Sequence, residues 1–141
     1  MAERKETMEK FGVIFAIWDG KSIQLEKRLK LGSKFFGLTI VPGGGVETGE
    51  TYQMAMKREV SEEYGVKATE FEPIGVVRDV EEGGIMNIRH VFLVTKWEGR
   101  LSNPERVKSK HLKATIEEAR VLCTHPISQR ILNLVEVNLK G

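Results

Sequence analysis

A segment of 23 residues, from Gly44 to Val66, constrains this chain more than any other part of its sequence. It follows Pro42 and opens with glycines, which let the backbone bend and approach a ligand closely. Thr51 is then a suitable helix N-cap, and Gly65 is a suitable C-terminal glycine. The segment therefore predicts a glycine loop that leads into a helix over residues 51–64.

The predicted helix concentrates carboxylates on one side. Glu59, Glu62 and Glu63 stand at i, i+3 and i+4, so they project from one face. Like charges at this spacing each weaken a helix by about 0.2–0.5 kcal/mol. A bound divalent cation would reverse that sign, and oxygen ligands suit Mg²⁺ or Mn²⁺. Taken alone, the three residues are also consistent with a solvated acidic face.

Size and charge limit the classes of protein to which the chain can belong. Its 141 residues suffice for one domain, which we expect to span residues 1–141. With 22 Lys and Arg against 20 Asp and Glu, no general affinity for a nucleic-acid polymer is expected. The only cysteine, Cys123, excludes an internal disulfide and suits a reducing compartment. We therefore expect a cytoplasmic protein in which Cys123 is a small core residue.

The N-terminal region predicts neither a signal peptide nor a membrane anchor. Residues 1–10 are polar and charged, and we expect them to be frayed or helical. The apolar run over residues 13–18 is far too short to span a bilayer. No association with a membrane is expected.

Apolar periodicity predicts an alternation of strands and helices. Residues 11–18 are apolar throughout, as in a strand buried on both faces, and the turn at residues 19–22 favours pairing with residues 23–28 as a hairpin. Residues 81–84 predict a hairpin tip, and residues 101–109 a polar loop. The other expected elements are strands over 35–41, around 74–77 and over 85–96, a short helix after Thr115, and a helix over 126–140.

Written as a pattern, the segment reads Gly44-x5-Glu50-x7-Arg58-Glu59-Val60-x-Glu62-Glu63-x-Gly65-Val66. This pattern resembles the Nudix box at every fixed position, and the resemblance covers most of the chain. It implies an α/β protein, a Nudix-type α/β/α sandwich with a mixed β-sheet. Members of this family hydrolyse a nucleoside diphosphate linked to another moiety, and they require Mg²⁺, for which Mn²⁺ can substitute.

The resemblance also implies roles for the residues of the box. Glu59 and Glu63 are expected to be the core metal ligands, with Glu62 and the Gly44 carbonyl as further ligands. Glu59 also occupies the place of a proposed general base. Arg58 and Glu50 are placed like the salt-bridged pair that orients the catalytic helix.

Outside the box the resemblance implies further candidates. Glu105 is the candidate for one more metal ligand from a later loop, with Glu98 as its rival. Base recognition would fall near Thr124 and His125, although His125 also suits a turn before Pro126. Other candidates are Arg78 and Arg89 for phosphate contacts, and Trp18 and Trp97 for stacking on a base. For each of them, a purely structural or surface role is the alternative.

The substrate follows only by elimination. Glu81 stands where the ADP-ribose branch carries a proline, and residues 81–83 lack the tyrosine of the diadenosine polyphosphate branch. The additional motif of the coenzyme A branch is missing upstream of the box. The resemblance thus implies a MutT-like enzyme that converts a (d)NTP, including an oxidised or non-standard one, to NMP and pyrophosphate. Hydrolysis of ADP-ribose, an NDP-sugar or a dinucleoside polyphosphate stays open as an alternative.

Two other classes of protein share the resemblance. A non-catalytic nucleotide-binding module would be expected to lose box carboxylates, and this chain keeps them all. An isopentenyl-diphosphate isomerase needs a catalytic cysteine upstream of the box, whereas Cys123 follows it. The expected partner is a small-molecule nucleotide, and a homodimer stays open because members of the family are often dimers.

Overall fold

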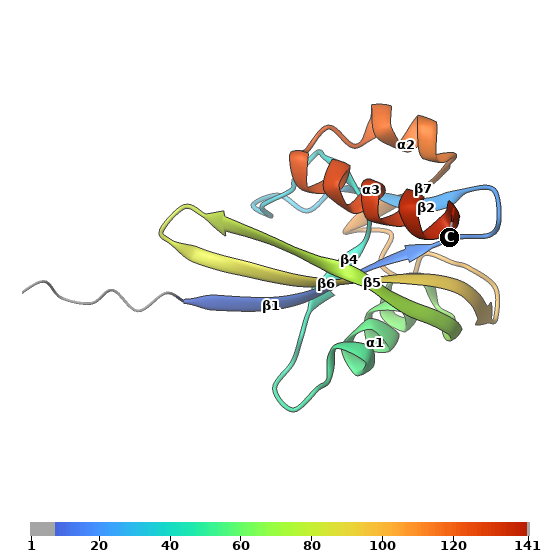
Figure 1. Cartoon of the computed structure of the whole chain (residues 1–141), viewed down its shortest axis with the longest axis horizontal. Helices are drawn as coiled ribbons and strands as arrows, with labels where there is room; N and C mark the ends of the chain where they lie inside the picture. Colours follow the sequence, from blue (N-terminus) through green and yellow to red (C-terminus); the bar gives the residue numbers. More distant parts are fainter. Residues whose placement is uncertain (1–7, 141) are drawn as a thin grey trace, which may run out of the picture.

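The structure is a computed structural model, and it describes residues 8–140. Its first sheet has the strand order β4-β1-β6-β5 (Figure 1). Strand β1 runs parallel to β6 and antiparallel to β4, so the sheet is mixed, as expected. The strands of this sheet are β1 (Glu9–Ile17), β4 (Gly43–Gly45), β5 (Lys67–Glu81) and β6 (Ile85–Glu98).

Within residues 8–140, a second sheet and three helices complete the fold. The sheet has the order β3-β2-β7, and both of its pairings are antiparallel. Helix α1 covers one side of the first sheet, while α2 and α3 lie on the other, so the predicted α/β/α sandwich is confirmed (Figure 1). The elements are β2 (Ile23–Arg28), β3 (Thr39–Ile40), β7 (Ser109–Ala114), α1 (Tyr52–Tyr64), α2 (Ile116–Leu122) and α3 (Pro126–Lys140).

Strand β1 separates two hydrophobic cores, because its successive side chains point to opposite faces. Val13, Phe15 and Ile17 pack in the core beneath α1. Ile14 and Ala16 pack in the core that contains α3. All five side chains are buried, which confirms the expectation of a strand buried on both faces.

The predicted hairpin between β1 and β2 is wrong. Asp19 builds the expected turn by accepting bonds from the backbone N–H groups of Lys21 and Ser22, at 2.9 and 2.6 Å. Only one bridge, between Trp18 and Ile23, joins the two segments, and β2 pairs with β3 and β7 instead. Both edges of β1 are already taken by β4 and β6, so β2 has no free edge of β1 to join.

The strand expected over residues 35–41 is only two residues long, Thr39–Ile40. Turns precede it, with hydrogen bonds from Phe36 N to Ser33 O at 3.2 Å and from Leu38 N to Phe35 O at 2.9 Å. Phe35 instead makes an edge contact with His125, with ring centroids 5.5 Å apart. The apolar residues of this segment therefore serve side-chain packing rather than a strand ladder.

Other boundaries also differ from the predictions. Strand β5 runs from Lys67 to Glu81, much longer than the four residues expected, and it absorbs Pro73 at a register shift. The loop expected over 101–109 gives way at Ser109 to β7, which the sequence analysis missed. Glu9 and Lys10 belong to β1, contrary to the frayed or helical start expected for residues 1–10; residues 1–7 of that prediction lie outside the described residues.

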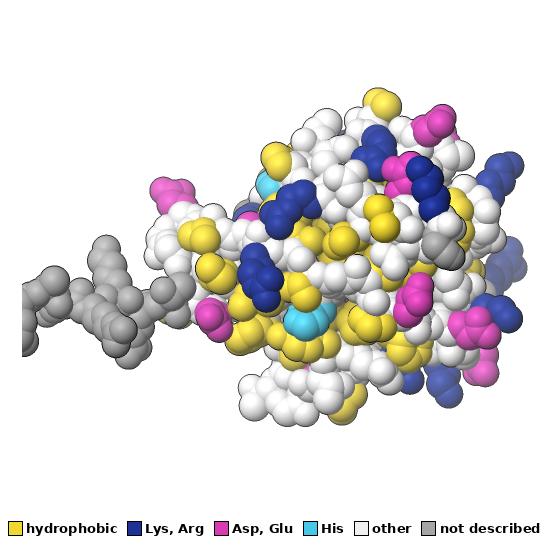
Figure 2. Space-filling view, in the orientation of Figure 1, with side chains coloured by type: hydrophobic (Ala, Val, Ile, Leu, Met, Phe, Trp, Pro, Cys, Tyr) yellow, Lys and Arg dark blue, Asp and Glu magenta, His cyan; other side chains and the backbone are white. Residues whose placement is uncertain are grey.

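Several side chains have the packing roles expected of them. Cys123 is fully buried in the core with α3. Trp18 and Trp97 are half-buried, and each packs against one of the two cores. Among the described residues, no helix combines the length and the apolar character needed to cross a bilayer. On the face drawn in Figure 2, basic and acidic side chains of the described residues are interspersed.

Candidate active site

Helix α1 begins and ends where the sequence predicts. The Thr51 hydroxyl accepts a hydrogen bond from Met54 N at 3.1 Å, which satisfies one free N–H of the first turn. Gly65 adopts a left-handed conformation, with φ 68°, and its N–H bonds Ser61 O at 2.9 Å. The helix buries an apolar face that includes Met56 and Val60, and this packing fixes the direction of its carboxylates.

Arg58 ties the glycine strand, the loop and the helix together. Its guanidinium donates two hydrogen bonds to Glu50, at 2.8 and 2.9 Å, and one to Gly45 O at 2.8 Å. It also donates to Glu59 at 2.7 Å and to Glu62 at 3.2 Å. The hydrogen bonds from Arg58 lower the pKa of Glu50 to about 2. The expected pairing of Glu50 with Arg58 is therefore present as a bidentate ion pair.

The glycine at position 44 lets β4 lie directly against Glu59. A Cβ atom on Gly44 would stand 2.2 Å from the Glu59 carboxyl carbon and 2.4 Å from each of its oxygens. Any side chain there would displace the carboxylate. Burial raises the pKa of Glu59, while its hydrogen bond from Arg58 acts in the opposite direction.

Glu63 lies deeper than the other carboxylates of the helix. It is only 3% exposed, and its buried Oε2 accepts no bond from an N–H group of the described residues. Burial raises the pKa of Glu63 to about 10, and the nearby carboxylates of Glu26 and Glu59 act in the same direction. Glu62, in contrast, is half exposed, with 49% of its side chain accessible.

Glu105 stands closer to this cluster than Glu98 does. Its charge raises the pKa of both Glu63 and Glu26, so its carboxylate faces the same space. Its carbonyl accepts hydrogen bonds from Lys108 N and Ser109 N, at 2.8 and 3.2 Å, which holds the loop before β7. Glu98 is exposed at the end of β6, in register with Lys67.

The carboxylates fit a divalent cation in chemistry but are not yet arranged around one. Across residues 8–140, no three Asp, Glu, His or Cys side chains converge closely enough to hold a metal ion. Arg58 holds Glu59 on one side, whereas the free buried oxygen of Glu63 points to no donor. In the metal-free protein the raised pKa of Glu63 keeps a proton on this buried group, and a hard cation would take the place of that proton.

The raised pKa of Glu63 predicts an unusual dependence of stability on pH. Its pKa is near 4.5 in the unfolded chain and about 10 in the folded protein, so between these values the folded state binds the extra proton. Raising the pH across this window therefore lowers the free energy of unfolding of the metal-free protein. We expect urea titrations in EDTA to show this fall, and Glu63→Gln to flatten it. A stability that rises across the window, with the same slope in the variant, would contradict the assignment.

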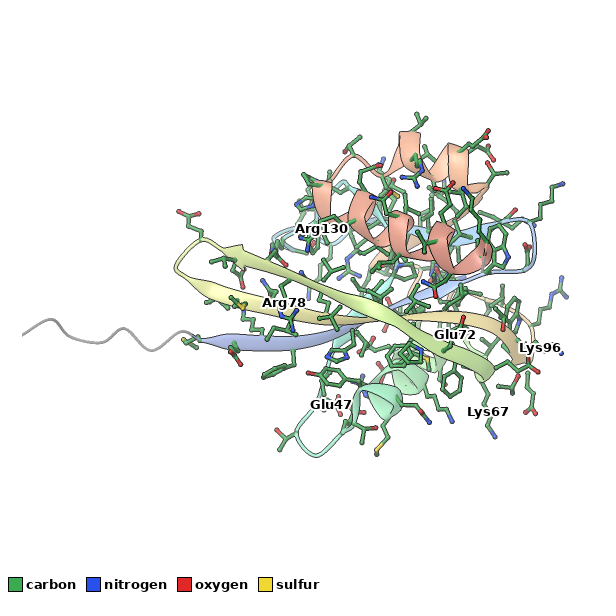
Figure 3. The ribbon with its side chains drawn as sticks, in the orientation of Figure 1. Glu47, Lys67, Glu72, Arg78, Lys96 and Arg130 are labelled. Carbon is green, nitrogen blue, oxygen red and sulfur yellow. The ribbon has the colours of Figure 1, made fainter. Side chains whose placement is uncertain are left out.

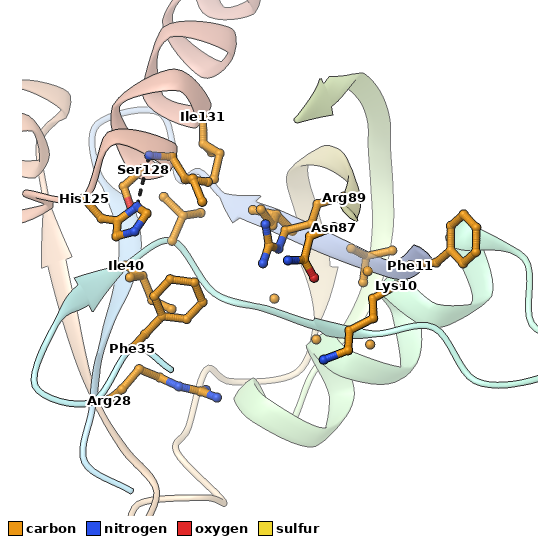
Figure 4. A pocket seen from close by; sticks show the side chains of 18 residues that line it. Lys10, Phe11, Arg28, Phe35, Ile40, Asn87, Arg89, His125, Ser128 and Ile131 are labelled. Carbon is orange, nitrogen blue, oxygen red and sulfur yellow. Dashed lines mark hydrogen bonds between the residues drawn. The ribbon is translucent and has the colours of Figure 1, made fainter. Parts of the chain in front are cut away.

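A cavity of about 280 Å³ opens beside the glycine strand (Figure 4). Arg89 and His125, both predicted substrate contacts, line it. Arg78 and Thr124 are exposed and do not line it; Arg78 lies on β5 beside Arg130 of α3, which bonds its carbonyl at 2.9 Å (Figure 3).

The side chains around the cavity combine apolar surface, charge and a directed donor. His125 accepts a hydrogen bond from Ile127 N on Nδ1 at 3.2 Å, so the neutral ring carries its proton on Nε2 (Figure 4). Phe35 presents a ring edge to the same histidine. The basic groups are already paired with acids: Lys10 with Glu81, Arg28 with Glu26, and Arg89 with Asp79. The apolar surface and the directed donor of the cavity thus suit a flat ring with polar edges.

Sequence reasoning missed Glu26 and Arg28, and it gave Phe35 no role in a binding site. Arg28 and Phe35 line the cavity, and Glu26 is fully buried beside Glu63. Successive side chains of β2 point to opposite faces, so Glu26 and Arg28 lie opposite the core residues Ile23 and Leu25. From the sequence, the face with Glu26 and Arg28 would be expected to be exposed to solvent. A buried use of that face becomes visible only when the second sheet packs against α1.

The fold and the site together define a class of protein: a small α/β/α sandwich that sets helix-borne carboxylates against a glycine strand at the edge of a cavity. Residues 8–133 match the NUDIX domain, which is nearly the whole of the described chain. The chain belongs to the NUDIX family.

Relatives of known name or structure agree with this assignment. The chain is 36% identical over 104 residues to the mouse (Mus musculus) protein named 8-oxo-dGDP phosphatase NUDT18; the match spans 74% of this chain but only 31% of that protein. The crystal structure of a MutT NUDIX hydrolase from Burkholderia pseudomallei superposes with a TM-score of 0.81, at 23% identity, over 91% of this chain and 98% of the other. The solution structure of the E. coli ORF135 protein gives a TM-score of 0.79 at 25% identity, over 96% and 93% of the two chains.

Proposed function

We propose that this Nudix hydrolase cleaves a nucleoside triphosphate, canonical, oxidised or otherwise non-standard, to the monophosphate and pyrophosphate with the help of Mg²⁺. The observation that carries the proposal is the position of Gly44. This residue lines the cavity and at the same time lies against the Glu59 carboxylate. A nucleoside held in the cavity would therefore have its phosphates beside the carboxylates of α1.

Residues that line the cavity would bind the nucleotide, and residues of the carboxylate cluster would support the reaction. His125 offers its Nε2–H and Phe35 its ring to a base, while Arg28 and Arg89 carry positive charge at the cavity wall. Nucleobases combine hydrogen-bonding edges with flat faces, and Arg forks suit phosphate oxygens.

On the opposite side of Gly44, the carboxylates would hold the cation. Glu59, Glu62 and Glu63, with the Gly44 carbonyl and Glu105, would supply its oxygen ligands. A bound Mg²⁺ neutralises phosphate charge and lowers the pKa of water. Glu59 would accept the proton of the attacking water, and Arg58, fixed by Glu50, would hold Glu59 in place.

The name of the mouse relative suggests which nucleotides to test first. Because the chain spans only 31% of that protein, its substrate is not assigned to this chain. An oxidised guanine nucleotide nevertheless presents the polar edges that the cavity suits. The cytoplasmic location and a homodimer stay predictions.

A panel of nucleotides tests the proposal. We expect turnover of at least one nucleoside triphosphate among dGTP, 8-oxo-dGTP and the other common dNTPs, with release of monophosphate and pyrophosphate, and no turnover in EDTA. Chromatography of the products would locate the bond that is cleaved. Turnover confined to ADP-ribose, NDP-sugars or dinucleoside polyphosphates would reject the proposal, and 8-oxo-dGDP separates diphosphate from triphosphate preference.

A further inference from the structure

Glu26, on the second sheet, is a carboxylate that the family motif does not include. It is fully buried, at 0% exposure, in the middle of β2. Arg28 donates a hydrogen bond to its Oε1 at 2.9 Å, whereas its Oε2 is buried and accepts no bond from an N–H group of the described residues. The Glu26 side chain also lies within hydrogen-bonding reach of the buried Glu63 carboxyl group.

Other unpaired polar atoms belong to the residues around Glu26. The Tyr64 hydroxyl and His111 Nε2 have no hydrogen-bond partner among the described residues. The Tyr64 and His111 rings stack with centroids 4.1 Å apart, and His111 is in register with Glu26 across β2 and β7. Buried polar groups are almost always paired, so exceptions among neighbouring residues point to a ligand.

We propose that Glu26 is a further carboxylate ligand of the divalent cation that α1 holds, supplied from the second sheet. The inference deepens the proposed function and rests on its cation. The buried carboxyl groups of Glu26 and Glu63 lie against each other, and a cation between them would take the place of the proton that they share in the metal-free protein. Glu26 would also connect the cation to the cavity, because its partner Arg28 lines the cavity wall.

The competing explanation is that Glu26 only anchors Arg28. An anchor of this kind needs one oxygen, and Oε1 already provides it. It does not account for the close approach of Glu26 to the buried Glu63 carboxyl group, where an apolar side chain would avoid the cost of burying a second acid. The two explanations predict different changes in metal affinity.

Substitution by glutamine separates the two explanations. Glu26→Gln keeps an oxygen that can accept the bond from Arg28 but removes the charge. We expect its affinity for Mn²⁺, measured without nucleotide by the EPR signal of free Mn²⁺, to fall by roughly 10–100-fold. The matched control is Glu72→Gln, which removes a carboxylate from the exposed face of β5 (Figure 3) and should bind Mn²⁺ like the wild type. An unchanged affinity in a folded Glu26→Gln variant would overturn the proposal.

A second measurement uses the wild-type protein and so does not depend on the folding of a variant. In crystals soaked with Mn²⁺, the anomalous signal should lie within about 2.5 Å of a Glu26 oxygen. An ion bound by Glu59 and Glu63 with Glu26 out of reach would overturn this inference and leave the proposed function standing. An ion bound far from α1, together with no nucleotide turnover, would overturn both this inference and the proposed function.

Discussion

Glu63→Gln is expected to lower kcat on the true substrate by at least about 10²-fold, the lower end of what a positioned acid–base group contributes. The glutamine has nearly the same shape, so it can occupy the same buried space beneath α1. It cannot carry the negative charge that a cation needs, and it leaves the pocket with one oxygen ligand fewer. Steady-state kinetics at saturating Mg²⁺ and nucleotide would measure the loss.

The control for this variant is again Glu72→Gln, because Glu72 is exposed on β5. Both variants replace one carboxyl group by an amide of nearly the same shape, so a loss confined to Glu63→Gln locates the effect in the site. Thermal unfolding in EDTA should show that Glu63→Gln is folded. Cleavage at the wild-type rate by this variant would contradict the proposal of a catalytic cation at α1.

Gly44→Ala is expected to lower kcat by roughly 10²-fold, because displacing a catalytic group by about 1 Å can cost that much. The added Cβ would stand 2.2 Å from the Glu59 carboxyl carbon. The atom in its way is the end of a flexible side chain, so the carboxylate moves while the strand stays. We therefore expect kcat to fall with little change in melting temperature.

Gly45→Ala provides the comparison for this second substitution. A Cβ at Gly45 meets no atom within 4 Å, and its backbone does not adopt a left-handed conformation. Its loss of kcat should be far smaller than that of Gly44→Ala. Equal losses in the two variants would mean that the strand tolerates no side chain at either position, and that the contact with Glu59 is not the cause.

The local parts of this fold could be predicted from local sequence. Thr51 and Gly65 bound α1 because capping depends on a few neighbouring residues. The capping box of Thr115 and Glu118 likewise begins α2, with hydrogen bonds of 3.0 and 3.2 Å. The resemblance to the Nudix box implied an ion pair between Glu50 and Arg58, and the structure contains it.

The features that sequence patterns did not predict depend on contacts between distant segments. Strand β7 is a short polar stretch, and it is a strand because β2 pairs with it along six residue pairs. Glu26 has the sequence context of an exposed strand residue, yet α1 and the loop of Glu105 face it. Phe35 has the apolar neighbours of a strand, but it lies in a turn at the cavity. Such outcomes follow from how sheets and helices meet, which periodicity does not encode.

The alternation of side chains along β1 has a consequence for evolution and design. A slip of one residue between β1 and β6 would send Val13, Phe15 and Ile17 to the wrong layer and bring Ile14 and Ala16 under α1. Both layers would be mispacked at once, so packing on each side of the sheet independently favours the observed register. Strand β4 pairs with β1, with Val13 opposite Gly44, so the distance between this glycine and α1 depends on packing on both sides of the sheet. Mutations that loosen either layer should therefore disturb the chemistry before they unfold the protein.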